Sequence, residues 1–412
     1  MIDTQFRLDA QGCRALLGRR LQEPAPSRIQ LLVGPRQVGK TSLLLGIAKE
    51  HGARARYAAG DGPELAAPGA WERIWGWAEE TAAARRYAIV LLDEIQHVAG
   101  WAARLKAEWD RLRRKKTAVH VVASGSSSLR IGAGSRESLA GRFERIVLTH
   151  WTAQAVSSTF GLPPDAAARQ IVLSGCYPGA QDFLRDRARW TAYVRDSILE
   201  PAITRDILSQ ADVRRPALLR QVFAVAAAYP AQIVAVHKIQ GQLAESGASE
   251  TIAQYLHLLE EAFLVTALEK HTQRPLRRRA APPKLVTLNN SLLAAADPRG
   301  APDPVREPER YGRWVENACL AYAWNSGQSV RYWREEPLEV DVVLHGEWGS
   351  WAIEVKTGPV EASDVAGLAE FCRRFPSFRP LLVCDDDNVK SGDRLGIDAV
   401  GWRRFLLEGP PR

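Results

Sequence analysis

The sequence predicts an α/β protein of several domains, and three observations support this. The chain has 412 residues, more than a single domain of roughly 100 to 200 residues holds. Between residues 28 and 150, short apolar runs alternate with helical stretches, as in a parallel sheet covered on both faces. Beyond residue 310, the pattern indicates a helix, three strands, a second helix and a fourth strand, which predicts a separate α/β domain.

The composition and the net charge of the chain exclude several classes of protein. Hydrophobic residues make up 46% of the chain and charged residues 25%, which excludes disordered, collagen-like and coiled-coil proteins. The sequence has no signal-peptide pattern and no apolar run near the ~20 residues of a membrane span, so we expect a cytoplasmic protein. The five cysteines include no CxxC pair, which argues against a disulfide framework or a zinc site. The net charge of +8 is compatible with a polyanionic partner.

The expected elements divide the chain into four parts. These are an α/β core, a helical segment, a domain of three helices and a strand, and a carboxy-terminal α/β domain, at residues 1–160, 161–212, 213–295 and 307–412. The core strands are expected at residues 29–33, 88–92, 119–123 and 146–148. The three helices are expected at residues 217–228, 236–245 and 249–262, before a strand at 285–288. Residues 296–308 are rich in Pro, Asp and Gly and predict a linker.

A glycine-rich loop lies between the first core strand and a helix that starts near Lys40. The pattern GxxxxGK[ST] is matched by Gly34, Pro35, Arg36, Gln37, Val38, Gly39, Lys40 and Thr41, with Ser42 next. In this context the loop of residues 34–42 would surround the phosphates of ATP at a helix N-terminus, with backbone N–H groups from every residue except Pro35. Lys40 would reach the β- and γ-phosphates, and Thr41 would ligate Mg²⁺. A glycine-rich turn without a ligand is the alternative.

Two carboxylates follow the expected strand at residues 88–92. Asp93 would hold Mg²⁺ through water, and Glu94 would polarise the attacking water. Because such a pair also caps helices, this interpretation depends on the glycine-rich loop. The next strand ends in two serines whose hydroxyls could sense the γ-phosphate, Ser124 as first choice and Ser126 as second, with a simple turn as the alternative.

Five stretches of the chain carry a resemblance to a known family: GPRQVGKTSLL, LLDEIQHVAGW, ASGSSSL, LAGRFERI and Gly175-Cys-Tyr-Pro178-Gly. Over residues 10–407 the chain resembles bacterial and archaeal ATPases that join an AAA core to a winged helix and a restriction-nuclease-like domain of unknown function. Cys176 stands where members often have a second glycine. In similar AAA+ ATPases an arginine reaches into the nucleotide site of the neighbouring subunit. Arg142 is best placed for this role here. The alternative is that Arg142 forms a surface salt bridge. The resemblance implies a homo-oligomer, with a ring hexamer favoured.

The third part has the order of a winged helix, with three helices, a basic loop and a strand. The exposed side of its third helix carries Glu250, Glu260 and Glu261, so groove reading by this helix is not expected. The loop and strand contain six basic residues and no acidic one: His271, Arg274, Arg277, Arg278, Arg279 and Lys284. These side chains are expected to contact DNA phosphates, with an affinity that falls steeply with salt. A solvated loop, or a winged helix that packs between subunits, is the alternative.

A second chemical site is expected in the carboxy-terminal domain. Asp341 precedes Glu354 by thirteen residues, and strand alternation places Glu354 and Lys356 on one face. In a hairpin, Asp341 and Glu354 would together hold Mg²⁺, while Lys356 would position or activate water. With Glu316 on the preceding helix, the order resembles the PD-(D/E)xK nuclease core of archaeal Holliday junction resolvases. An exposed hairpin with alternating charges, or a domain that has lost catalysis, is the alternative.

Together these patterns predict a P-loop AAA+ core with a parallel sheet, a helical and winged-helix middle, and a restriction-endonuclease-like α/β domain. The expected function is ATP hydrolysis that is coupled to the binding or processing of DNA. ATP and Mg²⁺ are the expected cofactors. Branched DNA such as a Holliday junction is one DNA structure on which the protein could act. Two alternatives stay open. One is an ATP-dependent signalling switch, and the other is a scaffold whose nuclease fold recognises a partner without catalysis.

Overall fold

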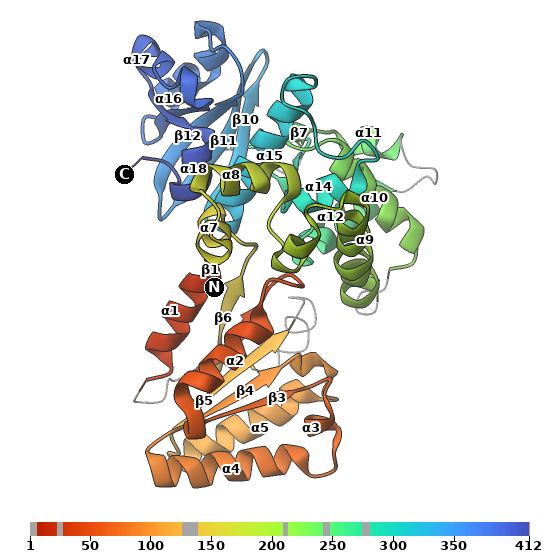
Figure 1. The fold of residues 1–412 in the computed structure, drawn as a ribbon, viewed down its shortest axis with the longest axis vertical. Coiled ribbons are helices and arrows are strands. Elements are labelled where there is room, and N and C mark those ends of the chain that lie inside the picture. Colours follow the sequence, from red (N-terminus) through yellow and green to blue (C-terminus); the bar gives the residue numbers. More distant parts are fainter. Residues whose placement is uncertain are drawn as a thin grey trace. The chain divides into compact units, whose positions relative to one another are not determined.

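The computed structural model describes residues 6–22, 28–125, 139–208, 213–241, 248–273 and 281–411. The chain divides into two compact units, Met1–Thr149 and His150–Arg412, which are described separately (Figure 1). None of the helices in the described ranges has the length and apolar character that crossing a membrane requires.

The first unit is a six-stranded parallel sheet with helices between its strands, drawn from red to yellow in Figure 1. Its strands are β1 (Phe6–Leu8), β2 (Ile29–Val33), β3 (Ala55–Ala59), β4 (Ala88–Asp93), β5 (Val119–Gly125) and β6 (Phe143–Leu148). Its helices are α1 (Ala10–Arg20), α2 (Lys40–His51), α3 (Pro63–Ala66), α4 (Ala70–Arg85) and α5 (Trp101–Arg114). The strands pair in the order β1-β6-β2-β5-β4-β3, and every pair is parallel. The expected parallel sheet is confirmed.

The three strands at the centre of this sheet, β2, β5 and β4, are buried along their whole length. Their near-continuous apolar sequences follow from burial on both faces. Because all strands run in the same direction, the loops after β2, β4 and β5 come together at one edge of the sheet. This edge positions the glycine-rich loop beside Asp93 and Ser124.

The second unit starts with helical segments. These are α7 (Ala153–Phe160), α8 (Pro164–Ser174), α9 (Arg187–Tyr193) and two π-helical segments, Val194–Leu199 and Ala202–Leu208. Thr152 caps α7, since its hydroxyl accepts a hydrogen bond of 3.1 Å from the backbone N–H of Ala155. The apolar faces of α7 and α8 share a small core in which Val156, Ala167 and Cys176 are buried.

A three-stranded antiparallel sheet and its helices follow in the second unit. The helices are α10 (Pro216–Ala228), α11 (Val236–Gln240), α12 (Ser249–Glu261) and α14 (Asn290–Ala296). The strands β7 (Gln232–Ile233), β8 (Val265–Leu268) and β9 (Lys284–Thr287) pair in the order β7-β9-β8. The apolar residues of α12 recur at helical spacing and are buried, as the sequence predicted for Ile252, Tyr255, Leu256, Leu258 and Leu259.

The carboxy-terminal part of this unit is a five-stranded mixed sheet, blue in Figure 1. Its strands are β10 (Ser329–Glu335), β11 (Leu338–Gly346), β12 (Gly349–Lys356), β13 (Arg379–Cys384) and β14 (Asp398–Gly401), in that order across the sheet. The helices are α15 (Pro308–Asn325), α16 (Ala366–Arg374), α17 (Ser391–Leu395) and α18 (Trp402–Glu408). The first three strands are antiparallel neighbours, and β13 and β14 run parallel to β12. The expected separate α/β sheet is confirmed, with β14 as an addition.

The core of this sheet lies between its strands and α16. Leu368 and Phe371 of α16 pack in one cluster with Trp333, Val343 and Leu382 of the strands. The ladder between β11 and β12 reaches the pair Val342 and Ile353, so Asp341 and Glu354 lie where this ladder ends. Both carboxylate residues are buried.

Candidate functional site

The glycine-rich loop joins β2 to α2. Gly39, the residue before the helix, has a φ of 95°, in the left-handed region where a side chain is costly. No side chain caps the first turn of α2, which suits a helix N-terminus that meets an anion. The side chain of Lys40 is buried, and its Nζ donates hydrogen bonds to the carbonyl oxygens of Gly34 at 3.1 Å and Pro35 at 2.7 Å. Carbonyl oxygens of the loop therefore bind the ammonium of Lys40.

Asp93, the last residue of β4, is the centre of the site. The residue is 2% exposed, and its Oδ2 accepts hydrogen bonds from the Thr41 hydroxyl at 2.7 Å and the Tyr57 hydroxyl at 2.9 Å. The Ser124 hydroxyl donates to Oδ1 of the same carboxylate. Burial and the contact with Asp93 raise the pKa of Tyr57 well above its ordinary value, so this hydroxyl stays a donor. The structure thus brings Thr41, Asp93 and Ser124 together, as the sequence analysis expected.

Glu94 follows Asp93 in a left-handed backbone conformation, with a φ of 44°. Its backbone N–H donates to Asp93 Oδ1 at 3.1 Å, and its side chain accepts a hydrogen bond from the amide of Gln96. The positive φ turns Glu94 out of the strand direction. Ser126, the second serine of the sequence analysis, lies outside the described residues.

Arg142 lies directly before β6 and is paired within its own chain. Its Nε donates to Asp110 Oδ1 at 2.7 Å and its Nη2 to Asp110 Oδ2 at 3.1 Å, a two-pronged contact with α5. Arg145, on β6 itself, is 6% exposed. Arg142 is therefore the more accessible of the two arginines.

Comparison with known protein families agrees with this geometry. Residues 26–156 match the family described as an AAA domain. We call residues 26–156 the AAA domain after this match. Residues 165–303 match the family "Domain of unknown function (DUF8612)", and residues 311–405 match "Domain of unknown function (DUF4143)". No curated protein matches the chain.

Solved structures similar to the chain include a Walker-type ATPase of Pyrococcus abyssi. It is 13% identical, has a TM-score of 0.51, and the match covers 70% of this chain and 95% of that chain. The RuvB Holliday junction branch migration motor of Thermotoga maritima matches with 18% identity, a TM-score of 0.34, and coverage of 63% and 88%. DnaA from Aquifex aeolicus, bound to AMPPCP, matches with 12% identity, a TM-score of 0.32, and coverage of 60% and 86%. The first of these similarities, with the strand order, shows that the AAA domain has the P-loop ATPase fold.

The carboxy-terminal domain contains a cluster of carboxylates around a lysine that the sequence analysis had assigned to DNA contact; Asp341 is buried, and Glu316 and Glu339 are half-buried. Lys284 of β9 is 1% exposed, and its Nζ lies 2.6 Å from Glu316 Oε1, 2.9 Å from Asp341 Oδ1 and 3.5 Å from Glu339 Oε1. The expected contact of Lys284 with DNA is therefore wrong for this structure, because the ammonium points into the protein. Lys356 Nζ lies 3.3 Å from Glu354 Oε1, on the same face of β12.

The other basic residues of the loop before β9 have different positions. The ring of His271 packs edge-on against Phe371, Phe375 and Phe378, at centroid distances of 5.3, 4.9 and 5.4 Å. His271 is thus a half-buried packing residue. Arg274, Arg277, Arg278 and Arg279 lie outside the described residues.

The charges of the carboxylate cluster are balanced by the two lysines and by protons. Burial and the neighbouring Asp341 raise the pKa of Glu316 to about 8 and that of Glu354 well above its ordinary value. Burial alone would raise the pKa of Asp341 as well, but the ammonium of Lys284 holds it below its ordinary value. At neutral pH, Asp341 is thus the ionised partner of Lys284, while Glu316 and Glu354 favour their neutral forms.

These residues do not fit a bound divalent cation as they stand. Across the described part of the chain, no three His, Cys, Asp or Glu side chains are arranged to hold a metal ion. The space that Glu316 and Asp341 enclose contains the ammonium of Lys284. The ammonium of Lys284 thus lies beside Asp341, one of the two residues expected to hold Mg²⁺, and Asp341, Glu354, Lys356 and Glu316 lie in one cluster.

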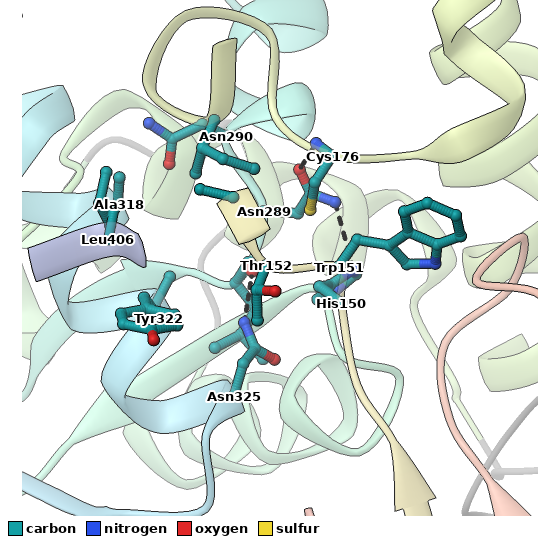
Figure 2. A pocket seen from close by; sticks show the side chains of 14 residues that line it. His150, Trp151, Thr152, Cys176, Asn289, Asn290, Ala318, Tyr322, Asn325 and Leu406 are labelled. Carbon is teal, nitrogen blue, oxygen red and sulfur yellow. Dashed lines mark hydrogen bonds between the residues drawn. The ribbon is translucent and has the colours of Figure 1, made fainter. Parts of the chain in front are cut away.

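A small cavity lies behind the motif that begins at Gly175, shown in Figure 2. Its volume is about 30 Å³, enough for a water molecule or two and too small for a nucleotide. Asn289 bridges its wall, since its Oδ1 accepts from the backbone N–H of Cys176 at 3.3 Å and its Nδ2 lies 3.2 Å from His150 Nδ1. A Cβ on Gly175 would lie 2.1 Å from Asn289 Oδ1, so the glycine is required for this network. The motif therefore has a packing role in this structure.

Proposed function

We propose that the chain is a Mg²⁺-dependent ATPase whose AAA domain hydrolyses ATP and whose second unit binds DNA. The observation that carries the ATPase proposal is the contact between Thr41 and Asp93, 2.7 Å from oxygen to oxygen, beside the buried ammonium of Lys40. A hydroxyl and a carboxylate at this place, at the end of a phosphate loop and a buried strand, are the oxygen ligands that Mg²⁺ requires.

In this proposal each side chain has a distinct task. Lys40 exchanges its two carbonyl contacts in the loop for phosphate oxygens. Thr41 and Asp93 would hold Mg²⁺, which offsets the charge of the phosphates when it is bound. Glu94 accepts a proton from the attacking water, a task for a carboxylate that is not itself tied to the metal. Ser124, on the neighbouring strand, orients Asp93 through its hydroxyl and would respond to the γ-phosphate.

The assembly is part of the proposal. We expect a homo-oligomer, with a ring hexamer favoured, in which Arg142 reaches the nucleotide of the adjacent subunit. The two-pronged contact with Asp110 is then a resting position from which the guanidinium is released on assembly. Arg142 is charged in both positions, so the release exchanges one carboxylate for phosphate oxygens.

DNA binding is proposed for the three-stranded sheet and its helices. The order α10, β7, α11, α12, β8 and β9 supports a winged helix, in which the segment between β8 and β9 would be the wing. This segment contains Arg274, Arg277, Arg278 and Arg279 and no acidic residue. Such a sequence suits contact with phosphates, with no selection among bases. Branched DNA such as a Holliday junction is one candidate ligand.

For the carboxy-terminal domain we propose a restriction-endonuclease-like fold. The support is its order: α15, the antiparallel strands β10, β11 and β12, then α16 and the parallel strand β13. The positions of Asp341, Glu354 and Lys356 in this order are those expected from the sequence. The second candidate function, a recognition module without cleavage, is favoured by the ammonium of Lys284 inside the cluster.

The test is ATP turnover by the full chain, measured alone and with duplex, single-stranded or four-way DNA. Glu94→Gln should bind a fluorescent ATP analogue normally and hydrolyse ATP about a hundredfold more slowly or worse, as expected for the loss of a general base. Glu72→Gln is the matched control, since this exposed glutamate on α4 forms a loose pair with Arg104, at 3.7 Å. Unchanged hydrolysis in Glu94→Gln removes Glu94 from the role of base. If DNA neither binds nor stimulates turnover, the signalling switch replaces the DNA-coupled ATPase.

A further inference from the structure

The carboxylate cluster of the carboxy-terminal domain already contains a cation, and this cation is part of the protein. Lys284 is the first residue of β9, in the sheet β7-β9-β8, whereas the carboxylates belong to α15 and to β11 of the five-stranded sheet. The side chain of Lys284 thus connects two sheets of the second unit. It is among the largest fully buried side chains of the described residues.

The geometry around Nζ of Lys284 is that of a cation site. Oxygens of Glu316 and Asp341 lie at 2.6 and 2.9 Å, and the side chain of Glu339 and the backbone carbonyl of Asp341 both lie at 3.5 Å. These oxygens come from three residues on two elements. Carboxylate and carbonyl oxygens of this kind are also the ligands of hard divalent cations.

Burying an ammonium is unfavourable unless carboxylates compensate for the lost hydration. Burying the ionised Asp341 beside Glu316 is unfavourable as well, because the charge of Asp341 repels a negative charge on Glu316 and favours its neutral form. Lys284 relieves both costs at once, since one ammonium contacts both carboxylates. A lysine that had only to pack could have been replaced by an apolar residue, but the carboxylates would then lack a positive partner.

We propose that Lys284 is the resident cation of this cluster, and that its ammonium takes the place of a divalent metal and keeps the domain closed to metal. This proposal goes beyond the ATPase and involves no nucleotide. The domain then keeps the residues of a nuclease-like site in a metal-free arrangement. The ammonium of Lys284 occupies the place that a metal ion would take. Lys284 is the first residue of β9, the strand that follows the arginine-rich segment in the sequence.

Removal of the ammonium should open the site. In Lys284→Ala, Glu316, Asp341 and the Asp341 carbonyl would enclose an empty space lined by oxygens. Oε2 of Glu354 is buried and has no hydrogen-bond partner among the described residues, so it offers a further ligand. Mn²⁺ is a suitable probe because it accepts oxygen ligands and is observed directly by electron paramagnetic resonance.

Lys356→Ala is the matched control. Lys356 is the other lysine of the cluster, with its Nζ 3.3 Å from Glu354 and 3.6 Å from Asp364. It lies at the edge of the cluster, with a side chain that is 35% exposed. Its removal leaves Lys284 in place, so the cluster should stay closed.

The experiment titrates Mn²⁺ into the nucleotide-free full chain carrying Asp93→Asn, which removes the proposed carboxylate ligand of the AAA domain. The background chain and Lys356→Ala should bind no Mn²⁺ at the cluster. Lys284→Ala should bind one Mn²⁺, and adding Asp341→Asn should abolish this binding. The unfolding temperature of Lys284→Ala should rise when Mn²⁺ is added, while that of the background chain should not.

Three outcomes would overturn the proposal. The first is a Mn²⁺ ion bound by the background chain and lost with Asp341→Asn. The second is uptake by Lys356→Ala, and the third is a folded Lys284→Ala chain that binds none. If Lys284→Ala does not fold, Lys284→Met restores the volume of the side chain without its charge. Mn²⁺ binding by the background chain tests whether the cluster is closed to metal, even if neither Lys284 variant folds. None of these measurements depends on ATP hydrolysis.

Discussion

The hydroxyl of Tyr57 donates a hydrogen bond of 2.9 Å to Oδ2 of Asp93, the oxygen that also accepts from Thr41 at 2.7 Å. Tyr57 lies on β3, at the edge of the parallel sheet, and β3 pairs with β4 in a register that sets Ala59 opposite Asp93. The carboxylate is therefore held from both sides, by the phosphate loop and by the edge strand. In the proposed ATPase, Tyr57 is a positioning residue for Asp93.

Tyr57→Phe should reduce ATP turnover by about fivefold, because one hydrogen bond worth about 1 kcal/mol no longer fixes Asp93. The affinity for ATP should change little, since Tyr57 is not expected to contact the nucleotide. Steady-state turnover and binding of a fluorescent ATP analogue measure the two effects. Tyr87→Phe is the control, since that hydroxyl contacts His51 and Arg54, each at 3.5 Å. Equal effects of both variants would contradict a role of Tyr57 through Asp93.

Substitutions of Arg142 and Asp110 should have different effects on ATP turnover, although the two side chains are paired in the structure. If Arg142 acts in the adjacent subunit, Arg142→Ala loses turnover, whereas Asp110→Asn keeps or raises it by releasing the guanidinium. A purely structural pair predicts similar losses for both variants. Mixing Arg142→Ala with Lys40→Ala subunits should restore part of the turnover, because some interfaces then have an intact loop and an intact arginine. Turnover that is unchanged in Arg142→Ala contradicts the proposed role.

The arginine-rich segment should determine DNA affinity through phosphates. Replacing Arg277, Arg278 and Arg279 together by Ala should weaken binding to all sequences alike and flatten the logarithmic salt dependence by about three units. Gel shifts at several salt concentrations measure both effects. Arg373→Ala with Arg374→Ala is the control, since both arginines on α16 are paired with Glu370. An unchanged slope in the triple variant would place the DNA path elsewhere.

The nucleotide site could be predicted from the sequence because its chemistry is local. The loop from Gly34 to Thr41 is one contiguous pattern, and Asp93 ends an apolar strand that is easily recognised. Tyr57 was missed because β3 is an edge strand with partial exposure, and its sequence has no apolar run that would indicate a strand. A strand at the edge of a sheet is covered less, so its pattern is weaker.

The carboxylate cluster was predicted only in part, and for a different physical reason. Strand alternation places Glu354 and Lys356 on one face, and the helix before the strands supplies Glu316. Lys284 could not be assigned, because in the sequence it ends a basic loop and resembles its neighbours. Its burial depends on contacts with residues 32 to 57 positions away, which no local pattern encodes.

The structure holds His150 in its neutral form. Its Nε2 lies 3.0 Å from the carbonyl oxygen of Phe263, and its Nδ1 lies 3.2 Å from Asn289 Nδ2. Since the carbonyl can only accept and the amide nitrogen can only donate, Nε2 carries the proton and Nδ1 accepts. Protonation of Nδ1 would replace that hydrogen bond by repulsion between two donors (Figure 2).

Burial, the main cause, lowers the pKa of His150 from 6.5 to about 4. Between these two values the unfolded chain binds a proton that the folded chain does not, so the free energy of unfolding falls as the pH falls. The contribution of His150 approaches about 1.4 kcal/mol per pH unit within this window. His120, whose pKa burial also lowers to about 4, adds a slope of the same sign.

His150→Gln should therefore be less stable than the natural chain at pH 7, but its stability should depend less on pH between 6.5 and about 4. Urea unfolding at several pH values, followed through the transition of the second unit, measures this slope. His345→Gln is the control, because His345 is exposed on β11 and its Nδ1 lies 2.7 Å from the hydroxyl of the nearby Ser350. The control should keep the full slope. A slope in His150→Gln equal to that of the natural chain would show that His150 is already protonated in the folded protein, in conflict with the network around Asn289.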